Sequence, residues 1–307
     1  MAEGRDLIVA AALIDTLVFA DGRAEAEVPG GAGLYALSGA ALFSDHALLV
    51  TGTGEDLPFG PWLDRNGLDR SGLRFADPHT PRNLLRYLDD RTRTETPVFG
   101  EAHFHRVEPH AGDIEKLVDG ARSAYIFRNT EPEFWDGVIR LRAARDFVLL
   151  WEIGLDACSP QERPAIERLL DHVDALSLNL EEAGLIFSVS GEEAVLQRLA
   201  DWPVETIFLR VGGRGSHVIT NGDAHFIPSL PVAAVDVTGG GNAYSGAALV
   251  GLAERRGAVT AAAMGTVAAS IAIGQLGLPE PGDPEVRALA GQRLAGLVTA
   301  IEKEMMA

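Results

Sequence analysis

Short apolar runs recur along the chain between segments of helical pattern. They predict β-strands, in chain order, at 7–13, 47–51, 124–128, 147–152, 175–179 and 206–211. Continuous apolar runs of this length are typical of strands in a parallel sheet that helices cover on both faces. Helices are predicted at 159–173 and at 191–202, the second opening on a glycine and acidic residues that suit a helix N-terminus. The pattern therefore predicts an α/β fold with a mostly parallel central sheet.

Two segments follow a different pattern. Residues 17–31 and 96–109 alternate apolar and polar positions with a period of two. Such alternation is typical of strands in a half-exposed sheet, because successive side chains point to opposite faces. We therefore predict that both segments form a small β lid beside the main sheet.

The segment 242–276 consists almost entirely of small apolar residues. It predicts two largely buried helices joined near Glu254, Arg255 and Arg256. The three charges between the helices exclude a single apolar span across a membrane. We expect both helices to pack against the sheet.

The amino-acid composition limits the kinds of molecule that the protein is expected to bind. The 307 residues carry 26 Lys and Arg against 44 Asp and Glu, a formal net charge of −18 at pH 7. Such a charge repels nucleic acid and anionic membranes, so we expect small-molecule partners, with no nucleic acid and no membrane. Cys158 is the single cysteine, which excludes an internal disulfide, and the apolar run at 7–14 is too short for a signal peptide. We expect one domain over 1–307, located in the cytoplasm.

A glycine-rich turn leads into a helix at 235–250, "VDVTGGGNAYSGAALV". Gly239, Gly240 and Gly241 place several backbone N–H groups and the positive end of a helix at one point, which is typical of an anion site. Glycine allows a phosphate to approach closely and allows positive φ angles. The alternative is a flexible turn that simply precedes a helix.

Two further motifs fit a phosphate site. Asn179 ends a predicted strand, and Glu182 lies three residues later in the first turn of a helix, where a carboxylate can hold hydrated Mg²⁺. Alternatively this pair is ordinary helix capping. The stretch "LRVGGRGS" ends a strand at Arg210 and turns through Gly212 and Gly215, which predicts a second wall of the phosphate pocket.

In this order and spacing, the motifs resemble the PfkB or ribokinase family of ATP-dependent carbohydrate kinases over nearly the whole chain. The matching positions are Asp15 after the first strand, the paired Gly30 and Gly31, the turn through Gly54, Asp56 and Gly60, the pair Asn179 and Glu182, the pair Gly212 and Gly215, and the signature at 236–242. The resemblance implies a three-layer α/β/α ribokinase-like domain with a small β lid that closes on a sugar. It also implies ATP with Mg²⁺, a monovalent cation, and a homodimer formed through the lid.

The resemblance assigns roles to individual positions. By the family pattern, Asp15, Gly30 and Gly31 bind substrate hydroxyls, and the N–H groups of Gly239, Gly240, Gly241 and Asn242 form the anion hole. Asn179 and Glu182 organise Mg²⁺ and the triphosphate; Arg210, Gly212, Gly215 and Thr238 line the nucleotide; Thr266 falls near the adenine; and Asp236 holds the monovalent cation.

Two positions depart from the family pattern. Asn242 stands where the family has the aspartate that takes the proton from the substrate hydroxyl, and an amide cannot act as that base. Tyr35 stands where an asparagine usually follows the double glycine. Together the two departures resemble a branch that includes the fungal maintenance-of-killer proteins. The sequence thus predicts a PfkB-type phosphotransferase for a sugar-like hydroxyl or, alternatively, a weak or inactive pseudokinase that binds nucleotide or sugar.

Two groups of residues are weaker candidates. Arg82, Arg86, Arg91 and Arg93 could grip an anionic group on a substrate, or they could lie on a solvated helix face with Arg86 paired to Asp89 or Asp90. His103 and His105, which would share one face of a lid strand, could with His110 suggest a metal site, although lid histidines without a ligand role are commoner.

Overall fold

The centre of the molecule is a nine-stranded sheet in the order β13-β12-β11-β10-β9-β8-β1-β4-β5. The computed structural model describes residues 4–88 and 93–306. Neighbouring strands from β5 to β11 pair in parallel, whereas β12 and β13 add an antiparallel hairpin at one edge. The strands of this sheet are β1 (Arg5–Val9), β4 (Ala47–Gly54), β5 (Leu73–Asp77), β8 (Ala121–Arg128), β9 (Val148–Ile153), β10 (Ala175–Asn179), β11 (Thr206–Arg210), β12 (Gly215–Thr220) and β13 (Asp223–Pro228).

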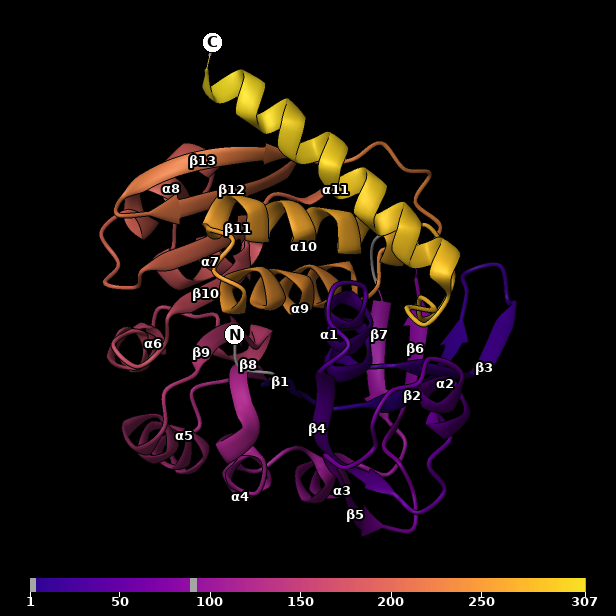
Figure 1. Cartoon of the computed structure of the whole chain (residues 1–307). Helices are drawn as coiled ribbons and strands as arrows, with labels where there is room; N and C mark the ends of the chain where they lie inside the picture. The colour runs from indigo at the N-terminus through magenta and orange to yellow at the C-terminus, as the bar shows by residue number, and fades with distance from the viewer. Residues whose placement is uncertain (1–3, 89–92, 307) are drawn as a thin grey trace.

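Helices cover both faces of the sheet (Figure 1). On one face pack α1 (Ala32–Ala41), α9 (Gly240–Ala253), α10 (Ala258–Ala272) and α11 (Pro284–Met305), with the short α2 (Gly60–Arg65) beside them. On the other face pack α4 (Ala111–Glu115), α5 (Pro132–Ala144), α6 (Arg163–Leu170), α7 (Leu180–Phe187) and α8 (Glu192–Leu199). These three layers confirm the predicted α/β/α fold.

Alternation along each strand explains why the strands are apolar on both faces. In β1, Ile8 belongs to the core beneath α1 and α9, while Leu7 and Val9 belong to the core on the opposite face. In β9, Leu150 and Trp151 divide between the two cores in the same way. Burial of each such apolar side chain stabilises the fold by about 1.5–3 kcal/mol. A polar residue in these runs gives up that stabilisation, so its presence calls for a structural or functional explanation.

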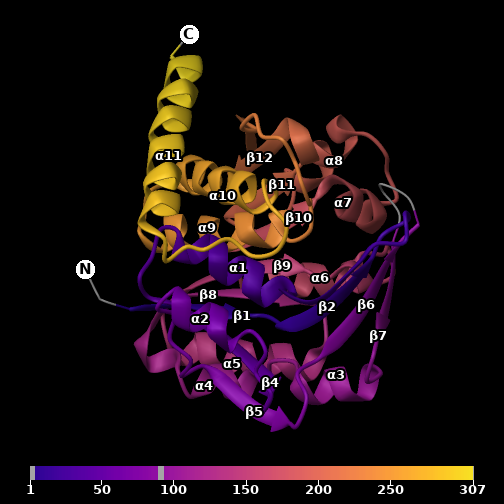
Figure 2. The same cartoon turned by 90° about the vertical axis from the view of Figure 1, so that its right-hand side faces the viewer.

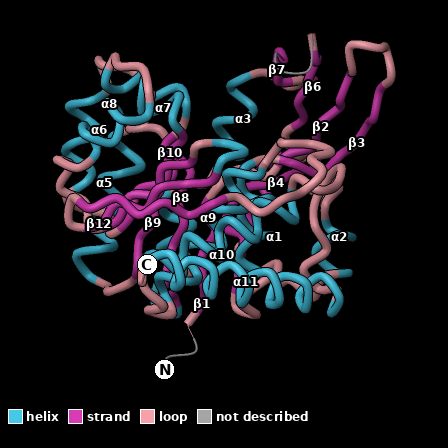
Figure 3. Tube along the Cα trace, turned by 90° about the horizontal axis from the view of Figure 1, so that it is seen from above, coloured by secondary structure: helices cyan, strands magenta, loops and turns pink. Residues whose placement is uncertain are grey.

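A second sheet of four strands, in the order β3-β2-β6-β7, stands away from one end of the main sheet (Figure 2 and Figure 3). Its strands are β2 (Leu13–Val18), β3 (Ala24–Gly30), β6 (Arg82–Tyr87) and β7 (Arg93–Pro97). Strand β2 pairs antiparallel with β3 and parallel with β6, so two segments distant in sequence meet in the lid.

The lid differs from the prediction in its second half. The segment predicted as a strand at 96–109 holds only the end of β7, after which Gly100, with φ of 77°, starts helix α3 (Glu101–Val107). His103 and Val107, four residues apart, are buried on one side of this helix. Residues four apart also lie on the same face of a strand, so this spacing in the sequence resembles the alternation of a strand. His103 and His105 therefore share no strand face.

The arginine-rich segment from residue 81 is also a lid strand, and the helix-face alternative for it is wrong. Asn83 and Leu85 are buried in β6 while Arg86 is exposed, which is the alternation of a strand. The expected pairing of Arg86 with Asp89 or Asp90, like Arg91, lies outside the described residues.

The first predicted strand, at 7–13, divides between two sheets. Strand β1 ends at Val9 in the main sheet, and β2 begins at Leu13 in the lid. The bend between them is held because Gly33 at the start of α1 donates its N–H to the carbonyl of Ala11, 2.9 Å away.

The two small-residue helices α9 and α10 lie side by side against the sheet, as predicted, with α11 across α10 (Figure 1). Within the described part of the chain, no helix is both long enough and apolar enough to cross a membrane.

Candidate active site at the lid and the first turn of α9

Close packing at the start of α9 explains two of its glycines, Gly239 and Gly241. Gly239 caps the helix with φ of 72°, and a Cβ there would lie 2.0 Å from the ring of Tyr35. A Cβ on Gly241 would lie 1.8 Å from Nη1 of Arg210. The preceding turn is tied by Thr238, whose backbone N–H donates to Asp236 Oδ1 at 2.9 Å. Because the first-turn N–H groups of a helix have no acceptor within the helix, this end can receive an anion.

The lid side of the site is equally tight. Asp15 is buried in β2, and a Cβ on Gly30 in the paired strand β3 would lie 2.4 Å from Asp15 Oδ2. Gly31, with φ of 88°, caps α1 and could carry no side chain, because its Cβ would lie 2.7 Å from the carbonyl oxygen of Ala11. Tyr35, one turn into α1, is buried against Gly239.

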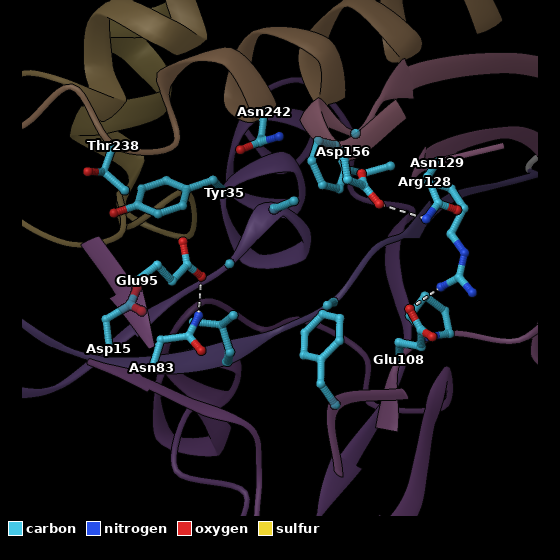
Figure 4. Close-up of a pocket in the computed structure, with 18 of the residues that line it drawn as sticks. Asp15, Tyr35, Asn83, Glu95, Glu108, Arg128, Asn129, Asp156, Thr238 and Asn242 are labelled. Atoms are coloured by element: carbon cyan, nitrogen blue, oxygen red, sulfur yellow. Dashed lines mark hydrogen bonds and ion pairs between the residues drawn. The ribbon is translucent and has the colours of Figure 1, made fainter. Parts of the chain in front are cut away.

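A cavity of about 340 Å³ lies between these two walls (Figure 4). Asp15, Gly31, Tyr35, Thr238 and Asn242, all expected site residues, line it together. Its volume is near the lower end of the range for small-molecule sites in proteins.

Several polar residues of the cavity were not predicted. They are Asn83 and Glu95 from lid strands β6 and β7, Glu108 after α3, Arg128 and Asn129 at the end of β8, and Asp156 in the short 3-10 helix η2 (Leu155–Ala157). Asn83 donates to Glu95, Arg128 pairs with Glu108, and Asn129 donates to Asp156 at 2.8 Å (Figure 4). The position of Arg128 and Asn129 at the carboxyl end of a parallel strand was the available signal, since ligands of open α/β sheets bind there.

A more open groove of about 1010 Å³ lies along the ends of β10 and β11. Asn179, Arg210 and Gly212 line it, and Asn179 and Arg210 are register partners in the two strands. Gly212 has φ of 66°, and a Cβ on it would meet no atom of the described residues within 4 Å, so the groove is open at this point. Gly215, with φ of 137°, is needed because a Cβ would lie 2.1 Å from the carbonyl oxygen of Ile227.

Asn179 and Glu182 form a complete capping box on α7. Asn179 Oδ1 accepts from the N–H of Glu182 at 2.9 Å, and Glu182 Oε2 accepts from the N–H of Asn179 at 2.7 Å. Burial raises the pKa of Glu182, and the nearby guanidinium of Arg210 opposes that rise. Asn179 and Glu182 therefore do cap the helix, as the alternative interpretation held. The capping uses one oxygen of the Glu182 carboxylate and leaves the second for another ligand.

A buried polar network lies beneath Asn242. Its amide nitrogen is 3.2 Å from the Tyr125 hydroxyl and 3.3 Å from Glu152 Oε1. The Tyr125 hydroxyl donates to Glu152 Oε2 at 2.9 Å, and Arg210 Nη1 lies 2.9 Å from Glu152 Oε1. Burial and the carboxylate of Glu152 hold the pKa of Tyr125 well above its ordinary value. Burial alone would lower the pKa of Arg210, but the carboxylates of Glu152 and Glu182 outweigh it and raise that pKa.

Sequence reasoning missed Tyr125 and Glu152 because both lie in apolar runs, at 124–128 and 147–152, that were interpreted only as strands. A glutamate at the carboxyl end of a buried strand was the signal that could have identified the network, because a buried charge needs a partner.

Other expected site residues lie apart from the cavity. Thr266 is buried within α10 and lines neither the cavity nor the groove. Asp236 accepts from Thr238 and donates its N–H to the carbonyl of Ile273 at 3.3 Å. Arg82 pairs with Asp56 at 2.9 Å and so links lid strand β6 to the predicted Gly54–Gly60 turn. It does not line the cavity.

The histidine candidates do not form a metal site. His103 Nε2 lies 3.0 Å from the carbonyl oxygen of His79, and His105 pairs with Glu108 at 2.9 Å. Among residues 4–88 and 93–306, no group of three or more His, Cys, Asp or Glu side chains could hold a metal ion. A Mg²⁺ ion here would need oxygens from a bound phosphate as well, which is its usual mode of binding.

Comparison with known proteins identifies the family to which this chain belongs. A family model described as pfkB family carbohydrate kinase matches residues 21–284. The chain belongs to this family. It is 27% identical over 254 residues to the cytidine kinase of Thermococcus kodakarensis, covering 79% of this chain and 86% of the relative. It is 23% identical over 297 residues to Protein MAK32 of Saccharomyces cerevisiae, covering 82% and 79%, which fits the resemblance to the fungal branch.

A solved structure supports the fold. The putative ribokinase II from E. coli in complex with ATP and Mg²⁺ superimposes with a TM-score of 0.74, covering 94% of this chain and 99% of that chain at 16% identity. At this identity the likeness shows the common fold.

Proposed function

We propose that this protein is an ATP-dependent phosphotransferase that acts on a hydroxyl of a small sugar-like substrate. The cavity carries the proposal, because Asp15 and Gly31 on the lid side and Thr238 and Asn242 at the start of α9 line the same cavity. A hydroxyl compound held by the carboxylate of Asp15 would therefore lie against a helix end that favours negative charge. The relatives that are named kinases support the same reaction class.

The groove along β10 and β11 is the proposed place of the nucleotide. ATP would supply the phosphoryl group, and Mg²⁺ would neutralise its oxygens. The residues present fit this pair, because Gly212 leaves the groove open and Arg210 has two buried nitrogens, Nε and Nη2, without a hydrogen-bond partner among the residues that the structure describes. Asn179 and Glu182 add an amide and a carboxylate at the same strand ends. The solved relative with bound ATP and Mg²⁺ supports this choice of ligands.

The protein groups would act mainly by positioning and by charge. Phosphoryl transfer depends largely on orientation and on stabilising charge on the phosphoryl oxygens, which the first turn of α9 and Arg210 can provide. Asn242 can accept a hydrogen bond from the hydroxyl, but it cannot take its proton. A general base contributes typically ~10²–10⁴-fold, so we expect a slow kinase.

A second candidate is a nucleotide- or sugar-binding module without turnover. One observation favours it: the amide of Asn242 is already engaged with Tyr125 and Glu152, and it offers no titratable group to the cavity. Both candidates predict ligand binding, and only the first predicts turnover.

Acceptor-dependent release of ADP from ATP separates the two candidates. The panel should contain neutral sugars, nucleosides and polyols, because the cavity is small and the named relatives include a cytidine kinase. The kinase proposal predicts ADP release above the acceptor-free rate with at least one compound, and loss of that release in Asp15→Asn. Ligand-induced stabilisation with no release on any acceptor supports the binding module.

Three further expectations belong to this proposal. A monovalent cation would bind at Asp236, next to the turn that starts α9. A homodimer would form through the lid, whose edge strands β3 and β7 each pair on one side within the described part of the chain. The protein would work in the cytoplasm, where ATP is available.

A further inference from the structure

The buried network beneath α9 brings together side chains from four distant parts of the chain. Tyr125, Glu152 and Arg210 come from β8, β9 and β11, and all three lie under the first turn of α9, where Asn242 points down to meet them. Glu152 is only 3% exposed. A carboxylate is costly to bury, so a buried one whose two oxygens both have polar partners indicates a role beyond packing.

The chemistry of the partners fixes the direction of the Asn242 amide. Glu152 as a carboxylate can only accept hydrogen bonds, and Tyr125 uses its one hydrogen toward Glu152, so its oxygen is left to accept. Both atoms therefore require the NH₂ group of Asn242, which lies 3.2 and 3.3 Å from them. The carbonyl oxygen Oδ1 must then point the other way. Figure 4 shows it on the side of Tyr35, toward the cavity.

We propose that Glu152 and Tyr125 are positioning residues that hold Asn242 with its carbonyl oxygen turned into the acceptor cavity. This inference rests on the proposed function, because the oriented oxygen would accept the hydrogen bond of the substrate hydroxyl and so aim the hydroxyl oxygen at the helix end. Arg210 completes the arrangement by neutralising Glu152 from the groove side, 2.9 Å away.

The same arrangement explains why position 242 is an amide in this chain. A carboxylate placed there would face Glu152 Oε1 where the amide nitrogen now lies, 3.3 Å away. Two carboxylates at such a distance cannot both be ionised without penalty, and one of them takes up a proton at higher pH than usual.

The contact between Asn242 and Glu152 can be tested by a cycle of stability measurements, which needs no assay of enzymatic activity. Asn242→Asp should lower the denaturation midpoint increasingly as the pH rises from 5 to 8, because the introduced carboxyl has a raised pKa in the folded protein. Asn242→Asp with Glu152→Gln should regain most of that loss. Asn221→Asp, at an exposed turn, is the matched control and should change little with pH. A single variant as stable as the natural protein at pH 8, or a double variant without recovery, would overturn the proposal.

The positioning role needs a readout that packing alone would not move. Tyr125→Phe keeps the ion pair of Glu152 with Arg210 and should fold even where Glu152→Gln does not. With an acceptor found in the ADP assay, we expect Tyr125→Phe to lower kcat about tenfold while the KM for ATP stays unchanged, since misplacement of a reacting group reduces rate rather than nucleotide binding. An unchanged kcat in folded Tyr125→Phe overturns the role.

The two proposals fail in different ways. If the natural protein releases no ADP with any acceptor, the kinase proposal fails, while the stability cycle still decides whether Glu152 sets the chemistry of position 242. If turnover is found but the cycle shows no coupling, the kinase proposal stands and the positioning inference falls.

Discussion

Replacement of Arg210 by glutamine should destabilise the protein strongly and in a pH-dependent way. The guanidinium lies 2.9 Å from Glu152 Oε1 and 3.6 Å from Glu182 Oε2, and all three side chains are largely buried. At an effective dielectric constant of about 20, a unit pair at 2.9 Å attracts by about 6 kcal/mol, much of which offsets the cost of burial. Removing one member of a buried pair costs about 3–5 kcal/mol, and we expect a loss of that size at pH 8.

The sign of the pH dependence follows from the carboxylates left behind. Without Arg210, the pKa of Glu182, which burial already raises, rises further above its unfolded value of about 4.3. The folded state then binds protons more tightly than the unfolded state, so stability falls as the pH rises from about 4.3 through the raised pKa. The loss should therefore be smaller at pH 5 than at pH 8.

Urea unfolding followed by tryptophan fluorescence at pH 5 and pH 8 measures this effect. Arg214→Gln is the matched control, because Arg214 pairs with Glu192 but is 61% exposed, and such pairs contribute about 0.2–1 kcal/mol. Arg210→Gln combined with Glu152→Gln should regain part of the loss, since one uncompensated charge is gone. A loss below 1 kcal/mol at pH 8, or an equal loss at both pH values, would refute the reasoning.

Three further predictions concern ligands and the single thiol. ATP with Mg²⁺ should raise the melting temperature, since ligand at a hundredfold above Kd adds about 2.7 kcal/mol; a melt unmoved by millimolar nucleotide would count against both candidate functions. Tyr35→Asn should strengthen ribose binding at least ~10-fold in calorimetry, because the Tyr35 ring fills space beside Gly239; tight ribose binding by the natural protein would contradict this. Burial raises the pKa of Cys158 to about 12, so iodoacetamide at pH 8 should label it only after unfolding; rapid labelling of the native protein would show the environment to be wrong.

The main sheet could be predicted because its strands carry the signal of burial in their own residues. The runs at 175–179 and 206–211 correspond to β10 and β11 within one residue, since both faces of these strands are covered. The two small-residue helices were predicted for the same reason. The lid was harder, because strands of a half-exposed sheet and short amphipathic helices share their spacing over a few residues, as the segment from Gly100 to Val107 shows.

The site could be predicted only where a residue type is dictated by the backbone or by a family motif. Gly31 and Gly239 require positive φ, and such positions are visible in sequence as glycine turns before helices. Asn83 and Glu95 come together only because β6 and β7 pair in the lid, and no local pattern reports that pairing. Glu152 was missed because its partner Arg210 lies two strands away in the sheet and was interpreted only as a nucleotide residue.

Formation of a phosphate monoester on an acceptor hydroxyl is the most direct measure of the proposed kinase activity. ³¹P NMR of the natural protein with ATP, Mg²⁺ and each acceptor, beside Asp15→Asn, follows product and ADP in one sample. We expect a slow monoester signal with at least one neutral sugar, nucleoside or polyol, and its loss in Asp15→Asn although ATP still stabilises that variant. No monoester on any acceptor, or a monoester formed equally by Asp15→Asn, would contradict it.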